Sequence, residues 1–208
     1  LSLTNDPSLS PAEVCDTTGQ AQTTWINKGP FVGGDGGLST TNCLTGGPDG
    51  QPGILAKCQV SKAHADGVLP RVNEDSILEC ITMNAAFSGK TQAIATCKSP
   101  KQGTCSSLLV VSDPPTYREL PSSWSTVTAT CPAGYTALSC NCWSAWAGHG
   151  QSNAGNACSG GTFAPDGNTC SRRGNRIQIF ATCEKVSEKD TPTASMSPSE
   201  IPSSSPSD

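Results

Sequence analysis

A short ending recurs three times in this chain of 208 residues, at residues 53–58, 92–97 and 178–183. Each copy consists of an apolar pair, an alanine, one polar residue and a final cysteine. Self-similarity of this kind is the sequence signature of repeat proteins. The recurrence therefore predicts three related units, each closed by a strand that a disulfide holds in place.

Weaker recurrences set the limits of these units. A short run with apolar character precedes each ending and closes on a cysteine, at Cys15, Cys80 and Cys140. A middle cysteine recurs at Cys43 and Cys170, and the second unit has none. The predicted units are residues 1–62, 63–103 and 104–186, with the second one shortened.

Cysteine usage places the chain in an oxidising compartment. There are 12 Cys but only 2 His, and no C-x-x-C pair is present. This pattern is typical of a disulfide framework in a secreted protein. The alternative is a zinc site at Cys140 and Cys142, but their C-x-C spacing is not the common structural one.

Strand patterns dominate the rest of the sequence. Residues 108–111, 127–130 and 176–182 are β-branched or alternating runs, and glycine-rich and proline-rich turns separate them. No convincing amphipathic helix is present, so the chain is expected to be all-β. Residues 187–208 are rich in Ser, Pro, Thr and Glu, a composition that predicts a disordered tail.

Several functional classes are disfavoured. The net charge of −4 and the pI of about 5.1 give no indication of nucleic-acid binding. No stretch approaches the roughly 20 apolar residues of a membrane span. No nucleophile and base are suitably placed in the sequence, so we expect no enzyme, no cofactor and no metal. The first residues lack a secretory signal, which indicates a signal removed upstream or a piece of a longer chain.

The third unit carries a resemblance to known families. The motif from Cys131 to Cys140 has the form C-P-x-G-Y-x-x-L-x-C, and Asn168-Thr-Cys170 and Phe180-Ala-Thr-Cys183 follow it. This module resembles the repeats of the cysteine- and histidine-rich C-terminal domain of proprotein convertase subtilisin/kexin type 9. Three such units also resemble the C-terminal β-rich (APCβ) domain of apicomplexan perforin-like proteins.

The resemblance implies a fold, a set of disulfides and a function. The fold would be a β-prism of three pseudo-threefold repeats, each a small disulfide-stapled antiparallel sheet. The implied pairs are Cys131 with Cys183, Cys140 with Cys170, Cys142 with Cys158, and Cys15 with Cys43. The partners of Cys58, Cys80, Cys97 and Cys105 stay open, since four cysteines allow three pairings. In the perforin-like family this domain follows a pore-forming domain and directs it to lipid.

Candidate lipid-binding residues lie outside the recurrent strands. Trp143 and Trp146 are on a short loop that the Cys142–Cys158 bridge would close, and Trp suits the boundary between water and hydrocarbon. The alternative is that one or both cap the core. Trp25, Ile26 and Phe31 form a second apolar cluster, which fits either a hairpin tip or two core strands.

Three further features complete the set. Leu108 and Leu109 fit either an exposed apolar loop or a buried edge strand, and Trp124 is expected in the core. Arg172, Arg173 and Arg176 form the dense basic cluster that would contact phosphate headgroups, unless they are only a solvated turn.

The favoured hypothesis is a membrane-binding domain of a secreted perforin-like protein, peripheral on a phospholipid surface and able to act as an oligomer. The alternative is an extracellular protein-binding or adhesion module of the convertase type. A glycan-binding β-prism is a third possibility.

Overall fold

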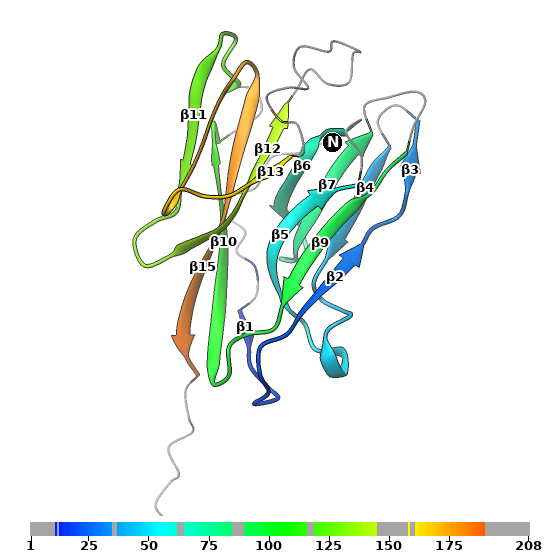
Figure 1. Ribbon diagram of the computed structural model, residues 1–208, viewed down its shortest axis with the longest axis vertical. Coiled ribbons are helices and arrows are strands. Elements are labelled where there is room, and N and C mark those ends of the chain that lie inside the picture. Colours follow the sequence, from blue (N-terminus) through cyan, green and yellow to red (C-terminus); the bar gives the residue numbers. More distant parts are fainter. Residues whose placement is uncertain are drawn as a thin grey trace, which may run out of the picture.

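Alternation of apolar and polar residues gives the strands an inward and an outward side, and the chain is all-β as predicted (Figure 1). The computed structural model describes residues 11, 13–34, 37–61, 65–84, 90–115, 119–144, 158 and 161–189. These residues form fifteen strands and a short 3-10 helix, Pro48–Gly50. The last strand continues to Glu188, so its end overlaps the segment expected to be a tail, and residues 190–208 lie outside the described part.

The first half of the chain forms a sandwich. One layer has the strand order β2-β9-β5, and the other has the order β6-β7-β4. Strand β9 contacts β4 and β7 across the two layers. The strands are β2 (Thr24–Lys28), β4 (Leu38–Asn42), β5 (Ile54–Val60), β6 (Ala65–Val72), β7 (Leu78–Asn84) and β9 (Ala93–Lys98). A separate short pair joins β3 (Val32–Gly33) to β8 (Lys90–Thr91).

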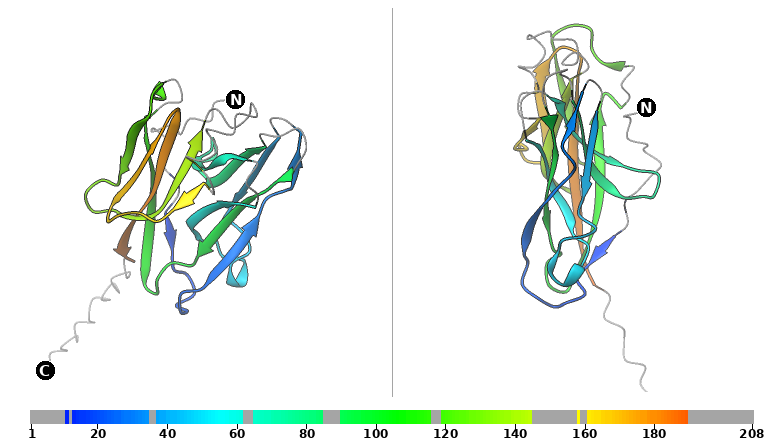
Figure 2. Two further views of the ribbon diagram at one scale, coloured as in Figure 1. Left: turned by 45° about the horizontal axis from the view of Figure 1, so that its top comes forward. Right: turned by 90° about the vertical axis from the view of Figure 1, so that its right-hand side faces the viewer.

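The second half forms another sandwich with the same layers. A ribbon of β11 (Ser125–Thr130) and β14 (Thr169–Gly174) covers one face of the sheet β10-β15-β12. The other strands of this half are β10 (Thr104–Asp113), β12 (Thr136–Ser144), β13 (Thr162–Phe163) and β15 (Ile177–Glu188). The two sandwiches lie side by side, as the views in Figures 1 and 2 both show.

The two halves repeat each other in strand register. Cys58 of β5 lies opposite Ala95 of β9, and Cys140 of β12 lies opposite Ala181 of β15. Both pairings contain an irregularity at the same place, shortly before that cysteine. The chain is therefore built from two equivalent units, in which β2, β4, β5, β7 and β9 correspond to β10, β11, β12, β14 and β15.

The disulfides follow the same twofold correspondence. Cys43–Cys97 and Cys58–Cys80 staple the first sandwich, and Cys131–Cys183 and Cys140–Cys170 staple the second at equivalent positions. Cys142–Cys158 is an additional bond in the second half. The three pairs implied for the third unit are therefore present, and no cysteine is free.

A threefold repeat and a prism are not confirmed. Residues 53–58 form β5, whose counterpart is β12, whereas residues 92–97 and 178–183 belong to the equivalent strands β9 and β15. The expected boundary at 62/63 lies between two strands of one sandwich, and the boundary at 103/104 separates the two halves. The ending recurs three times because two different strands of the unit share one short pattern.

The expected pair of Cys15 with Cys43 is wrong. Strand β1 (Val14–Cys15) pairs with β10, and the register places Cys15 opposite Cys105, to which it is bonded. Cys43 directly follows β4, on the side of the sandwich that faces β9, and bonds to Cys97 there. The Cys15–Cys105 bond therefore ties the N-terminal segment to the second half.

Asp16 fixes this N-terminal segment further. Its carboxylate accepts backbone hydrogen bonds from Gly103 at 2.8 Å, Gly19 at 2.9 Å and Thr18 at 3.0 Å. These N–H donors, Gly103 first, hold the pKa of the Asp16 carboxyl below its ordinary value. The carbonyl of Asp16 accepts a hydrogen bond from Lys189 Nζ at 2.8 Å, so the segment is also held at the end of β15.

One long sheet joins the halves, with the strand order β1-β10-β15-β12-β6-β7-β4. The junction is the pairing of Gly67 in β6 with Trp143 in β12. A side chain at Gly67 would overlap the carbonyl of Cys142, and its φ of +125° also favours glycine. Apolar side chains of both halves form one cluster there, in which Phe180 and Trp143 pack with residues of the first sandwich.

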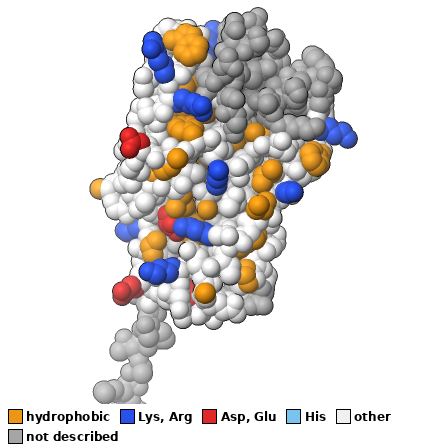
Figure 3. Space-filling view, in the orientation of Figure 1, with side chains coloured by type: hydrophobic (Ala, Val, Ile, Leu, Met, Phe, Trp, Pro, Cys, Tyr) orange, Lys and Arg blue, Asp and Glu red, His pale blue; other side chains and the backbone are white. Residues whose placement is uncertain are grey.

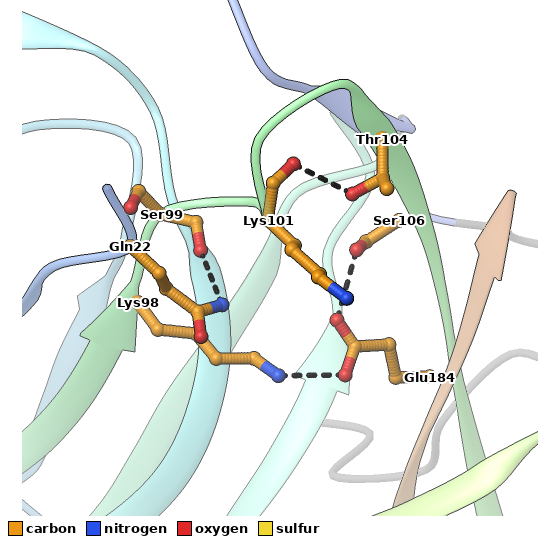
Figure 4. A network of polar contacts seen from close by, with 7 residues as sticks. All are labelled: Gln22, Lys98, Ser99, Lys101, Thr104, Ser106 and Glu184. Atoms are coloured by element: carbon orange, nitrogen blue, oxygen red, sulfur yellow. Dashed lines mark hydrogen bonds and ion pairs between the residues drawn. The ribbon is translucent and has the colours of Figure 1, made fainter. Parts of the chain in front are cut away.

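Polar contacts cross the same junction (Figure 4). Lys98 Nζ, at the end of β9, lies 2.6 Å from Glu184 Oε2 of β15, and Ser106 Oγ donates to Glu184 Oε1 at 2.8 Å. Asn141 Nδ2 donates to the carbonyl of Cys58 at 3.0 Å. Lys98 and Glu184 are equivalent positions of the two units, each directly after the closing cysteine.

Candidate functional site

The expected Trp loop is not an exposed tip at Trp143. Strand β12 continues to Ser144, where it pairs with β15, and the Trp143 side chain is only 4% exposed in the cluster at the junction. A side chain packed in this way cannot enter a bilayer without opening the sheet. Trp146 lies outside the described residues.

Leu108 and Leu109 are also wrong as lipid-binding residues. Both lie in β10, which pairs with β15 along its whole length. Leu108 is buried at the junction, and Leu109 packs against the second core from a partly buried position. The alternative of a buried strand is the one that the structure shows.

The side chains of the three arginines in the basic cluster do not point the same way. Arg172 and Arg173 are neighbours in β14, so their side chains point to opposite faces of the ribbon. The guanidinium of Arg172 lies over the Phe163 ring, 5.0 Å from its centroid, and Arg173 is exposed. Arg176 is exposed in the following turn. The three arginines therefore do not form one headgroup site.

The apolar cluster of the first half is the part that reaches the surface. Trp25 is partly buried because its ring packs over Gly47 and Gly53, and its Nε1 donates to the carbonyl of Thr45 at 3.3 Å. Ile26 points to the other side of β2 and is 60% exposed. Phe31, in the turn after β2, is 59% exposed.

The exposure of Ile26 is explained by the twofold correspondence. Ile26 lies opposite Thr96 as Val110 lies opposite Thr182, so Ile26 and Val110 are equivalent. Val110 is 5% exposed because its face of the second sheet is covered at the junction. The equivalent face of β2-β9-β5 keeps Ile26 in solvent.

The exposed charged residues of this outward face, Lys28 and Lys57, are both basic. The outward residues of β2, β9 and β5 form rows across the sheet. One row consists of Ile26, Thr96 and Lys57, and the next consists of Lys28, Ile94 and Gln59. The third row has Thr24, Lys98 and Ile54, of which Ile54 is buried and Lys98 pairs with Glu184 of β15, so this end of the face is covered at the junction. On the side in view in Figure 3, Lys and Arg are likewise more frequent than acidic residues. We call Ile26, Lys28, Lys57 and Ile94 of this face, together with exposed Phe31 of the turn after β2, the β2 surface.

Trp124 differs from its expected place in the core, because it is 56% exposed directly before β11. The alternation of β11 supplies the signal that sequence reasoning missed. Val127 and Ala129 are buried, so position 124 is in phase with the exposed positions 126, 128 and 130.

Two other features are weaker candidates. A cavity of about 170 Å³ at the edge of the junction has apolar walls that include Val14, Leu55 and Leu108. It is smaller than the roughly 300 Å³ at which ligand pockets begin. Glu13 lies close to the sulfur atoms of Cys15 and Cys105, but these atoms are bonded to each other and offer no thiolate to a metal.

Within the described part of the chain, no helix is long and apolar enough to cross a membrane. No protein-family model matches the chain, and a search of curated proteins finds no relative.

Proposed function

We propose that this protein binds the surface of phospholipid membranes through the β2 surface, and that anionic lipid strengthens the binding. One observation carries the proposal: Ile26 is 60% exposed on a sheet face whose exposed charged residues, Lys28 and Lys57, are both basic, in a chain with a net charge of −4. Apolar side chains beside lysines suit the boundary of a bilayer, where the former enter the acyl region and the latter meet phosphates.

The expected affinity follows from the exposed side chains. Phe31 exposes 59% of its surface, which corresponds to about 120 Å² and about 3 kcal/mol if it enters the apolar region. Ile26 adds about 1–2 kcal/mol. Lys28 and Lys57 add about 1 kcal/mol each near an anionic surface. The sum of about 6–7 kcal/mol corresponds to a dissociation constant in the tens of micromolar.

A vesicle titration tests the proposal. The protein is mixed with phosphatidylcholine vesicles with and without 30% phosphatidylserine, and the bound fraction is measured by flotation. We expect binding in the tens of micromolar with phosphatidylserine, and about 30-fold weaker binding after Lys28→Gln with Lys57→Gln, since each lysine contributes about 1 kcal/mol. Raising the salt should weaken wild-type binding, because exposed charges are screened. Absence of binding to both vesicles would exclude membrane binding.

The wider context is also proposed. Six disulfides are typical of extracellular proteins, which supports secretion. An attached pore-forming domain as partner is proposed from the sequence resemblance of the three recurrent units to the APCβ domain of perforin-like proteins. Several copies in an oligomer would raise the moderate affinity of one copy by avidity.

A further inference from the structure

The ribbon of β11 and β14 has one face of hydroxyl groups. Its inward positions, Val127, Ala129 and Cys170, are buried in the second core. Its outward positions form three cross-strand rows, which are Thr126 with Arg173, Thr128 with Ser171, and Thr130 with Thr169. All three β11 threonines, Ser171 and Arg173 are exposed, and Thr169 is partly exposed.

The hydroxyls of two rows are paired with each other. Thr128 Oγ1 lies 3.0 Å from Ser171 Oγ, and Thr130 Oγ1 lies 3.3 Å from Thr169 Oγ1. Each hydroxyl has one donor and two acceptor positions. After the mutual bond, each pair still offers one O–H and several lone pairs to solvent. A ligand with hydroxyl groups that both donate and accept matches such a face.

An aromatic ring lies at the end of the same face. Trp124 is 56% exposed and directly precedes β11, in phase with the outward threonines. A Trp exposed to this extent is an apolar platform that packing of the fold does not require. The C–H face of a pyranose ring is the apolar surface that accompanies sugar hydroxyls, and it stacks on an indole.

The charge beside these groups is positive. Arg173 is exposed opposite Thr126, in the row nearest to Trp124. Arg176 has a φ of 52°, and its backbone N–H donates to the carbonyl of Pro121 at 2.8 Å, so this turn is fixed to the segment that leads to Trp124. Two acidic residues lie at the ribbon: Asp113, whose Oδ2 accepts the backbone N–H of Thr128 at 3.0 Å, and Asp166, which bridges to Thr169 at the end away from Arg173. An arginine fork pairs well with a carboxylate.

We propose that the outward face of the β11–β14 ribbon binds a saccharide that carries a carboxylate. The Trp124 ring stacks on the apolar face of a pyranose, the hydroxyl pairs bind sugar hydroxyls, and Arg173 binds the carboxylate. This site is independent of the β2 surface, because the two lie in different halves of the molecule (Figures 1 and 2).

The probe is sialyllactose, with lactose as its neutral counterpart and sodium acetate as a carboxylate without a sugar. Binding to the whole protein is followed by titration calorimetry and by Trp fluorescence. We expect sialyllactose to bind at least about tenfold more tightly than lactose, because the charged hydrogen bonds to Arg173 are lost in lactose. Acetate at the same concentration should give no saturable signal.

Three variants locate the site. Trp124→Ala should weaken sialyllactose binding about tenfold or more, and Arg173→Gln should remove the preference over lactose. Val186→Ala is the matched control, since Val186 is 53% exposed on β15 and lies outside the ribbon. Equal binding of both sugars, no binding of sialyllactose at 10 mM, or unchanged binding after Trp124→Ala would each overturn the proposal.

Discussion

Truncation of Phe31 is the sharpest test of the β2 surface. Phe31 is 59% exposed, so Phe31→Ala removes apolar contact with the membrane and little contact within the protein. The exposed area of about 120 Å² at about 25 cal/mol per Å² gives an upper value of about 3 kcal/mol. Alanine keeps a small part of this, so the expected loss is about 2–3 kcal/mol. This corresponds to roughly 30- to 150-fold weaker binding.

The assay is flotation of wild type and variant with phosphatidylserine-containing vesicles over a range of lipid concentrations. Leu44→Ala is the matched control, because Leu44 is 44% exposed in the segment after β4 and lies outside the β2 surface. It should bind within twofold of wild type. The thermal unfolding of both variants should match wild type, since neither side chain is buried. Binding of Phe31→Ala within threefold of wild type would refute insertion of this side chain.

The remaining predictions concern the junction and the N-terminal segment. Gly67→Ala should lower the free energy of unfolding by at least about 2 kcal/mol, because the new methyl group overlaps a carbonyl of β12. Gly50→Ala, also at positive φ but in open space, should lower it by only about 1 kcal/mol. Equal losses in chemical denaturation would contradict the steric explanation. Lys98→Met leaves the buried carboxylate of Glu184 without its cation and should lower the free energy of unfolding by about 3 kcal/mol. Adding Glu184→Gln in a double variant should restore part of this loss. Denaturant titration of the single and double variants measures both effects. The lowered pKa of Asp16 stabilises the fold above its unfolded pKa of about 4, and this contribution is lost as the pH falls through the folded pKa. Asp16→Asn should therefore lower the melting temperature at pH 7, and the difference from wild type should narrow below about pH 4; a difference that stays constant to pH 2.5 would exclude this role.

Local patterns were sufficient for the strands, and the resemblance of the third unit to a known module implied the three disulfides of the second half. The alternation around Ile179 identified a strand, β15, that the structure contains, but neither it nor the cysteines predicted a sandwich. The three expected units are not confirmed, because two of the three endings, β5 and β9, are neighbouring strands of one sheet with nearly the same short pattern. A pattern of six residues shows that a strand ends on a cysteine, but not which partner strand that cysteine faces.

The candidate site depended on long-range packing, which the sequence shows less directly. Trp143 and Trp124 are both next to strand residues, yet one is 4% and the other 56% exposed. Trp143 is buried because β6, some 75 residues earlier, pairs with β12 at that position. Ile26 is exposed because the junction covers the other copy of its face but reaches only the end of its own face, at Ile54 and Lys98. Burial at these positions is decided by how the two halves meet.

The duplicated sheet face has an evolutionary consequence. When a folding unit is copied within one chain, the surface that joins the copies is duplicated with it. Here Val110 is buried at the junction of the two halves, whereas the equivalent residue Ile26 is exposed to solvent. Selection for stability constrains Val110, because a polar residue there would weaken the joint. Ile26 is not constrained by packing in this way, so the residues of its face can change without loss of stability. Related chains should therefore vary in the character of the first-half face while they keep the second-half face apolar, and the uncovered copy is where new binding specificities would arise.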